Sequence, residues 1–464
     1  MSIFCLGALL GCAAAPGVAN GLGRKTALLV ASTTCVIGAV CEASASLVPP
    51  CMVDCTLSPG VLLMLVGRVI TGCGCGASTV VVPIYLGELA PPHLRGAFGV
   101  LFQLACVCAL LTAQVAGLPS VLGSDALWPC YILGGVLIPS AIQFLMRAHL
   151  LESPSWLVSQ GPDEGQEAER VLCLLRNVDF HDFGEARQAV MREIDYMQVM
   201  AFTGDGHKGP TSPRGEKAGN EMYALLRDVK LRTSLKITIT CAIGQQFSGI
   251  NNAFNFSSTF LSANGMDAAT VTLIAVLMNV GNVFVTILSA WLMDRAGRKA
   301  LLLTSTLSMC GAILMLSVAL SNPGQSWTAV CAIISVCTFV CAFGIGMGPV
   351  PWLLPAELFP AERVAYAPHT SASHAPFTRA HLTRSSSRAP RSTGSAIAAM
   401  CNWLANFVCG LIFLPLASAL GGLCFLPFLI VLLPFATFVA TIPETRGKSV
   451  QQILAELGER KGWD

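Results

Sequence analysis

The sequence predicts an all-α polytopic membrane protein, and composition, hydropathy and the placement of charge support this. Of the 464 residues, 54% are hydrophobic and only 12% are charged, whereas a soluble protein carries roughly 25% charged residues. Eleven apolar runs are long enough to cross a bilayer, for which about 20 residues are needed. Lys and Arg occur in every second connection between these runs. This composition excludes an ordinary soluble fold.

The eleven predicted spans cover nearly the whole chain. They are residues 3–20, 26–48, 60–84, 96–117, 128–147, 234–262, 269–292, 300–320, 327–354, 395–418 and 423–441. The connections without Lys or Arg are those near 49–59, 118–127, 263–268, 321–326 and 419–422. By the positive-inside rule the other connections, and with them the C-terminus, are expected to be cytoplasmic.

The first run allows two interpretations. Ala13–Ala15 resemble the small-residue cleavage region of a signal peptide. A spanning helix is favoured, because no basic residue precedes the run and Gly21–Lys25 follow it as a cytoplasmic turn would.

A long loop divides the chain into two halves that share a short basic turn. Residues 20–25 follow the first run of the first half, and residues 294–299 follow the second run of the second half. Transporters built from two parallel halves show such repeats. Aligning the repeats implies that the opening helix of the first half is missing. We expect an N-terminal bundle at 1–147, a cytoplasmic loop at 148–233, a C-terminal bundle at 234–441 and a cytoplasmic tail at 442–464.

Two segments outside the spans differ in composition from the rest. In the long loop, residues 164–178, 184–200 and 221–236 have helical spacing, and 202–220 have the composition of a disordered linker. Residues 364–390 contain no acidic residue and many Ser, Pro, His and Arg. We expect a disordered insertion there, either a regulatory loop or, as we favour, the product of an incorrect reading frame.

The most informative stretch is Gln245–Ser257, which places two Gln and three Asn in an apolar run. Amides in hydrocarbon are costly unless they face a bundle interior or a water-filled cavity. Each amide offers a donor and an acceptor, which suits an uncharged ligand rich in hydroxyl groups. A polar contact between helices explains the same residues equally well. Gly249 is expected to break or bend this helix.

Charged residues at the predicted cytoplasmic ends form a second candidate group. In each half a Glu at a helix end precedes an Arg by six or seven residues. These residues are expected to form a latch between the halves, and independent solvated charges are the alternative. The set comprises Glu88, Arg95, Asp294, Arg295, Arg298, Glu357 and Arg363.

Arg68 is a charge inside a span, in a run with four glycines at positions 67–76. An intramembrane charge is functional by default, so Arg68 should face the cavity or a polar partner in a neighbouring helix. The glycines let helices approach closely.

Seven stretches together resemble the sugar porters of the major facilitator superfamily, in particular the facilitative glucose transporters. They are GRVITGCGCG, PIYLGELAPPHLRG, ESPSWL, QQFSGIN, DRAGRK, GPVPWLLPAELFP and PETRGK, in the family's order through almost the whole chain. The resemblance implies the major facilitator fold, with two helical bundles and about 11 of an expected 12 transmembrane helices. It also implies transport of a hexose such as glucose by alternating access, with facilitated diffusion favoured. A proton-coupled symporter, a sugar sensor and an inactive truncated product remain alternatives.

The resemblance also implies a set of substrate-binding positions. They are Gln103, Gln245, Gln246, Asn251, Asn282, Trp352, Asn402 and Asn406. Removing residues 364–390 restores the family spacing and puts Arg391 at the place of the usual loop arginine, so Arg391 joins the latch. Gly344 departs from the family, because many glucose transporters have a Glu there.

The expected partners are a small-molecule sugar and the lipid bilayer, with no nucleic acid. We find no nucleophile–base set, metal-ligand spacing or cofactor loop, so we expect no enzyme, no metal and no cofactor. Cys51 and Cys55 share a polar loop and are a possible disulfide pair. The resemblance implies a monomer as the functional unit and favours the plasma membrane over an internal membrane. The sequence does not identify the sugar.

Overall fold

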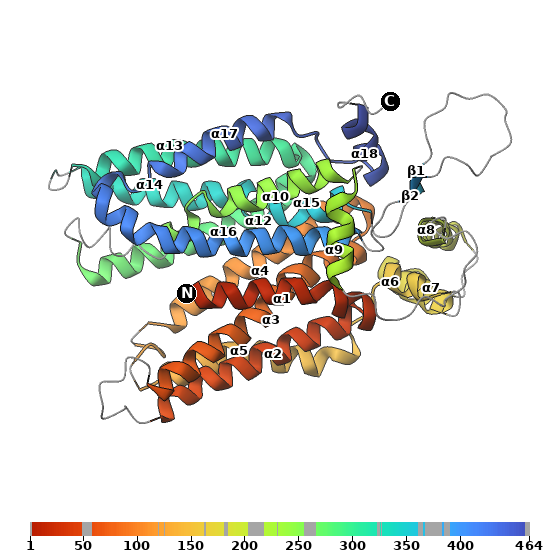
Figure 1. Cartoon of the computed structure of the whole chain (residues 1–464), viewed down its shortest axis with the longest axis horizontal. Helices are drawn as coiled ribbons and strands as arrows, with labels where there is room; N and C mark the ends of the chain where they lie inside the picture. Colours follow the sequence, from red (N-terminus) through yellow and green to blue (C-terminus); the bar gives the residue numbers. More distant parts are fainter. Residues whose placement is uncertain are drawn as a thin grey trace.

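The computed structural model describes most of the chain. The described residues are 2–48, 58–118, 120–124, 126–161, 164–180, 184–202, 218–229, 231–254, 266–322, 325, 327–360, 365–366, 383–384 and 390–459. Long helices lie side by side in two groups, with shorter helices at one end (Figure 1). Because this end carries the turns with Arg24 and Arg298, we call it the basic end.

The first group contains five helices. They are α1 (Ser2–Leu22), α2 (Arg24–Ser44), α3 (Pro59–Leu89), α4 (Arg95–Ala116) and α5 (Trp128–Leu145). The short 3-10 helices η1 (Ala45–Leu47), η2 (Pro92–Leu94) and η3 (Met146–Ala148) lie at helix ends.

The second group contains the remaining long helices. They are α10 (Arg232–Gln246), α12 (Ala268–Ala296), α13 (Arg298–Leu320), α14 (Thr328–Ala342), α15 (Val350–Leu358), α16 (Pro390–Leu420) and α17 (Pro427–Thr441). A π-helix, η5 (Phe343–Met347), joins α14 to α15, and a 3-10 helix, η7 (Gly421–Leu423), follows α16. Helices α6 (Pro154–Gln160), α7 (Gly165–Arg176), α8 (Glu185–Phe202), α9 (Ala218–Arg227) and α18 (Val450–Glu459) lie at the basic end (Figure 1).

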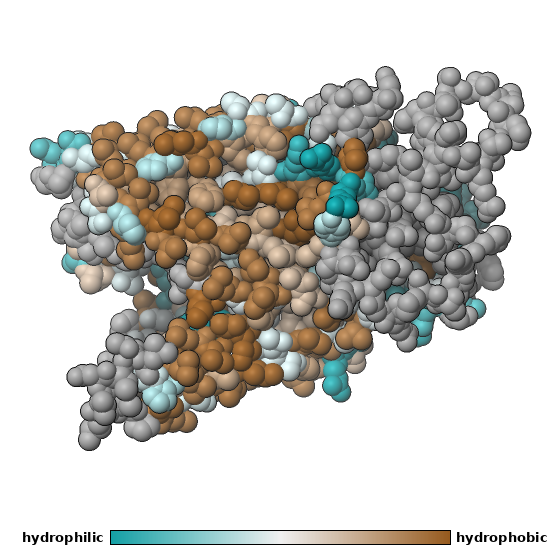
Figure 2. Space-filling model, in the orientation of Figure 1, coloured by the Kyte–Doolittle hydropathy of each residue, from teal (hydrophilic) through white to brown (hydrophobic). Residues whose placement is uncertain are grey.

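The predicted fold class is confirmed. Within the described residues, nine helices are long and apolar enough to cross a membrane. The two other predicted spans correspond to α10 and α17, which have 15 residues each. Exposed apolar side chains cover much of the helical surface, and hydrophilic residues gather near the basic end (Figure 2).

Glycines bring α3 close to α1, as the sequence predicts. A Cβ added at Gly72 would lie 2.3 Å from the carbonyl oxygen of Phe4, and one at Gly76 would lie 2.0 Å from that of Ala8. No side chain fits between these backbones. Close backbone approach through small residues is a common way to pack helices in a membrane.

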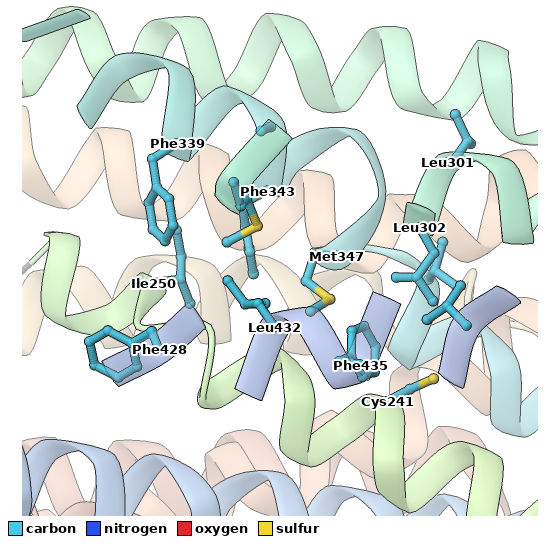
Figure 3. Packing of buried hydrophobic residues seen from close by; sticks show 14 of the residues in the cluster. Cys241, Ile250, Leu301, Leu302, Phe339, Phe343, Met347, Phe428, Leu432 and Phe435 are labelled. Atoms are coloured by element: carbon cyan, nitrogen blue, oxygen red, sulfur yellow. The ribbon is translucent and has the colours of Figure 1, made fainter. Parts of the chain in front are cut away.

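The core of the second group surrounds the π-helix. Phe343 and Met347 belong to it, and Figure 3 shows their side chains directed toward Leu432 and Phe435 of α17. Since a π-helix widens one turn of an α-helix, this packing holds an irregular backbone segment inside the bundle. The polar site described below is built around the same segment.

The structure revises several expected boundaries. The helical spacing predicts one helix over residues 221–236, but α9 ends at Arg227 and α10 starts at Arg232. Within the predicted insertion, Ala365–Tyr366 (β1) pairs with Thr383–Arg384 (β2) in an antiparallel sheet, and Pro390 already starts α16. The rest of 364–389, the Cys51–Cys55 pair, Arg363 and most of the linker at 202–220 lie outside the described residues.

Candidate functional site

The repeated basic turns form matching clusters, one in each group of helices. Gly23 and Gly297 have φ values of 90° and 87°, a region that L side chains rarely adopt. The arginine after each glycine starts the next helix. Such a glycine allows the chain to reverse between two antiparallel helices.

In the first group, Arg24 is 8% exposed and forms a bidentate ion pair with Glu88 of α3, at 2.9 and 3.0 Å. A second carboxylate, that of Glu152, accepts the backbone N–H of Arg24 at 2.9 Å. A carboxylate there is favourable because the free N–H groups at a helix N-terminus carry partial positive charge. The cluster therefore joins α2, α3 and the segment before α6.

The second group repeats this arrangement. The Arg298 guanidinium donates to Glu357 of α15 at 3.0 and 2.7 Å. Its backbone N–H donates to Glu444 at 2.9 Å. Thr445 adds a hydroxyl bond to Glu357 at 2.6 Å.

The expected latch would join the two groups of helices. The ion pairs of these clusters instead join helices within the same group. The reason is the order of the helices, which places Glu88 and Glu357 beside the turn arginine of their own group. A contact between the groups comes from Asp294, whose Oδ2 accepts the backbone N–H of Ala97 at the start of α4, at 3.1 Å. Asp294 also lies 3.5 Å from Arg298.

The other arginines of the expected latch have different surroundings. The Nε of Arg95 is buried and has no hydrogen-bond partner among the described residues. Arg295 is exposed and lies over the Trp291 ring, 3.9 Å from its centroid. Arg391 donates to the carbonyl oxygen of Phe359 at 3.2 Å. None of these contacts pairs the two groups through opposite charges.

Arg68 has the polar partner that the sequence analysis expected. Its Nε lies 3.1 Å from Glu42 of α2. Thr71 donates to the same carboxylate at 2.8 Å. The Glu42 side chain is 3% exposed and that of Arg68 is 41% exposed, so the carboxylate is the more buried partner.

The amides of the QQFSGIN stretch form a connected network with α16. Asn402 donates to Gln245 Oε1 at 2.7 Å, and Gln246 donates to Asn402 Oδ1 at 2.9 Å. Asn251 donates to Gln246 Oε1 at 2.7 Å. Gly249 has a φ of 86° just after α10 ends at Gln246, which confirms the expected break in the helix. The break lets the segment that follows carry Asn251 back toward Gln246.

The π-helix brings three of the expected positions together. Gln245 donates to the carbonyl oxygens of Met347 and Gly348 at 2.8 and 2.9 Å. A Cβ added at Gly348 would lie 3.1 Å from Gln103 Nε2, and one added at Gly344 would lie 2.7 Å from Asn282 Oδ1. Side chains from α4, α10 and α12 therefore meet around residues 343–348.

Asn282 differs from the other amides. It is 1% exposed, and neither its Nδ2 nor its Oδ1 has a hydrogen-bond partner among the described residues. A buried donor or acceptor without a hydrogen-bond partner lowers stability by about 1–3 kcal/mol for each group. The side chain thus retains capacity for a ligand that both donates and accepts.

A pocket between the two groups adjoins this network. Its lining residues include Thr79, Pro83, Trp352, Ser395 and Asn402. Trp352 is partly exposed and packs edge-on against Phe102 of α4, with ring centroids 5.3 Å apart. An aromatic side chain and an amide thus line the same pocket.

Asn406 is the expected position with least support. It is partly buried and forms no side-chain hydrogen bond with another described residue. The roles of Arg24, Glu152 and Glu444 are not predicted from the sequence. These residues lie in the repeated turn and in the ESPSWL and PETRGK stretches, but the sequence does not indicate which charge pairs with which.

Comparisons with known proteins agree with this architecture. The family model described as "Sugar (and other) transporter" matches residues 1–367 and 365–457. The facilitated glucose transporter member 4 of Bos taurus is 31% identical over 460 residues, which cover 98% of this chain and 78% of the bovine protein. Member 3 of Oryctolagus cuniculus is 30% identical over 457 residues, covering 98% and 80%.

A solved structure shares the fold. It is the major facilitator proton:xylose symporter XylE bound to 6-bromo-6-deoxy-D-glucose. Its TM-score is 0.76 at 22% sequence identity, covering 98% of this chain and 87% of the other. With the family match over nearly all residues, these findings show that the chain is a multi-pass membrane protein with the fold of XylE and that it belongs to the sugar transporter family.

Proposed function

We propose that this protein carries a hexose such as glucose across the membrane by facilitated diffusion. The observation that supports this most directly is Asn282, a buried amide with unused donor and acceptor capacity beside a network of further amides. A neutral sugar hydroxyl both donates and accepts. A charged substrate would instead require a buried counter-ion.

We propose alternating access as the mechanism, with the two groups of helices moving against each other around the amide network. In this proposal the basic end is cytoplasmic, and the contact of Asp294 with Ala97 closes it. Opening that end separates α12 from the N-terminus of α4. The ion pairs of Arg24 and Arg298 lie within their groups, so they keep each group rigid while the groups move.

Facilitated diffusion is favoured because the relatives that are about 30% identical are named facilitated glucose transporters. The span acid Glu42 is engaged by Arg68 and Thr71. We further propose that the monomer is the functional unit and that the protein resides in the plasma membrane.

Uptake of labelled glucose by cells that lack hexose transporters tests the proposal. We expect saturable uptake that an uncoupler of the proton gradient leaves unchanged, and a strong loss in Asn282→Ala and Trp352→Ala at equal surface expression. Asn322→Ala is the matched control, because this exposed amide at the far end of α13 bonds only to Val318 within the described residues. Absence of uptake and of sugar binding would refute transport, and uptake abolished by the uncoupler would indicate proton symport.

A further inference from the structure

A second amide on α12 has unused hydrogen-bonding capacity. Asn279 is 3% exposed, and its Oδ1 is buried with no hydrogen-bond partner among the described residues. Its Nδ2 donates to Gln114 Oε1 of α4 and, at 3.1 Å, to the carbonyl oxygen of Ala275. Asn279 therefore bridges the two groups of helices while one of its polar atoms stays unpaired.

The place of Asn279 relates it to the proposed sugar site. Asn279 and Asn282 are three residues apart, so their side chains lie on one face of α12 with Cβ atoms roughly 5–6 Å apart. Together they present three unpaired buried atoms, namely both Oδ1 atoms and the Nδ2 of Asn282. In the interior of a membrane protein such atoms are expected only where a ligand or water forms the missing hydrogen bonds.

The hydrogen bonds of Asn279 also fix what it offers a ligand. A side-chain amide has two N–H donors, and Gln114 and Ala275 accept both. The Oδ1 of Asn279 is the polar atom that has no hydrogen-bond partner among the described residues. Asn279 therefore presents an acceptor and no donor, whereas Asn282 presents both.

We propose that Asn279 is a further substrate-contacting residue that determines specificity. Its Oδ1 accepts a hydrogen bond from a sugar hydroxyl next to the part of the sugar held by Asn282. Because Asn279 offers only an acceptor, the site requires a hydroxyl that donates at this position, and neither hydrogen nor fluorine can replace it. This inference rests on the proposed sugar transport and adds the chemical requirement for one hydroxyl.

A panel of deoxy- and fluoro-hexoses tests the requirement through their inhibition constants against glucose uptake. In the wild type, replacing one particular hydroxyl by hydrogen or fluorine is expected to weaken inhibition roughly tenfold, which corresponds to about 1.4 kcal/mol. In Asn279→Ala this penalty disappears, while the penalties at the other hydroxyls remain. Asn279→Ser keeps a hydroxyl oxygen and is expected to retain part of the penalty.

Asn20→Ala is the matched control. Asn20 of α1 is partly buried and donates to Ser392 Oγ of α16 at 3.0 Å, so it tests the removal of an amide that joins the two groups of helices at the basic end. Its analogue profile should equal that of the wild type. Surface expression and monodispersity of each variant are measured in parallel, and Asn279→Ser carries the test if Asn279→Ala does not fold.

Two results would overturn the inference. One is an Asn279→Ala profile in which all analogues keep their wild-type penalties. The other is a uniform change in affinity for every analogue, which is what a purely structural role predicts. A wild type that binds no hexose would refute the proposed function itself, so the two failures can be told apart.

Discussion

The two arginine–glutamate pairs at the basic end look equivalent in sequence, but they should respond differently to loss of the carboxylate charge. Among the described residues, Arg24 has one carboxylate paired with its guanidinium, that of Glu88, whose side chain is 1% exposed. Arg298 has two, because Asp294 lies 3.5 Å away in addition to Glu357. The perturbations we compare are Glu88→Gln and Glu357→Gln.

The expected loss of stability in each variant follows from the burial of its ion pair. Removing one partner of a buried ion pair costs about 3–5 kcal/mol because the other charge is left uncompensated, and we expect this for Glu88→Gln. In Glu357→Gln the carboxylate of Asp294 still compensates Arg298. Its side chain is 32% exposed, so solvent limits that contribution to about 1 kcal/mol. Glu357→Gln should therefore cost about 2–4 kcal/mol.

The assay is thermal denaturation of purified fluorescent fusions, followed by size-exclusion chromatography. Glu88→Gln should melt at the lower temperature, and the double variant Glu357→Gln with Asp294→Asn should melt at a temperature similar to that of Glu88→Gln. Asparagine at 294 keeps an acceptor for the N–H of Ala97. Glu167→Gln is the control, because its pair with Arg170 is largely exposed and should contribute little.

The reasoning would be refuted if Glu357→Gln melted at or below the temperature of Glu88→Gln. It would equally be refuted if Asp294→Asn had no additional effect in the Glu357→Gln background. Either outcome would mean that the compensating carboxylate does not act on Arg298.

Three further predictions concern single positions. Gly344→Ala should strongly lower uptake, because its Cβ would lie 2.7 Å from Asn282 Oδ1 and would displace that side chain; uptake normalised to surface expression checks this. Gly249→Ala should lower stability by more than about 1 kcal/mol in a thermal melt, because φ is 86° and the Cβ would lie 2.8 Å from the Phe428 ring. Glu42→Gln should lower stability by about 1–3 kcal/mol, since a charge-assisted bond to Arg68 is lost, and its uptake should stay insensitive to an uncoupler.

The sequence predicted features that depend on local composition. A run of apolar residues is recognisable wherever it packs, because the bilayer imposes both its length and its polarity. The break at Gly249 and the close packing at Gly72 and Gly76 likewise follow from the missing Cβ. The amides of QQFSGIN indicate a candidate site because polar groups inside a span are costly unless they face the bundle interior or a water-filled cavity.

Tertiary structure alone decided which partner each polar group has. Glu88 pairs with Arg24 and not with Arg95, which is nearer in sequence, because α2 and α3 meet at the basic end. Periodicity indicates the face of a helix on which a residue lies, but it does not indicate the neighbouring helix.

The same limit explains why no pairing of Asn279 with Gln114 is predicted from the sequence. They lie in different spans, and 165 residues separate them in the chain. Only the packing of α12 on α4 brings them together. The sequence thus determined the spans, the basic end and the types of side chain at the site, because these depend on local composition. The structure determined the pairing, because hydrogen bonds and ion pairs depend on which helices are neighbours in space.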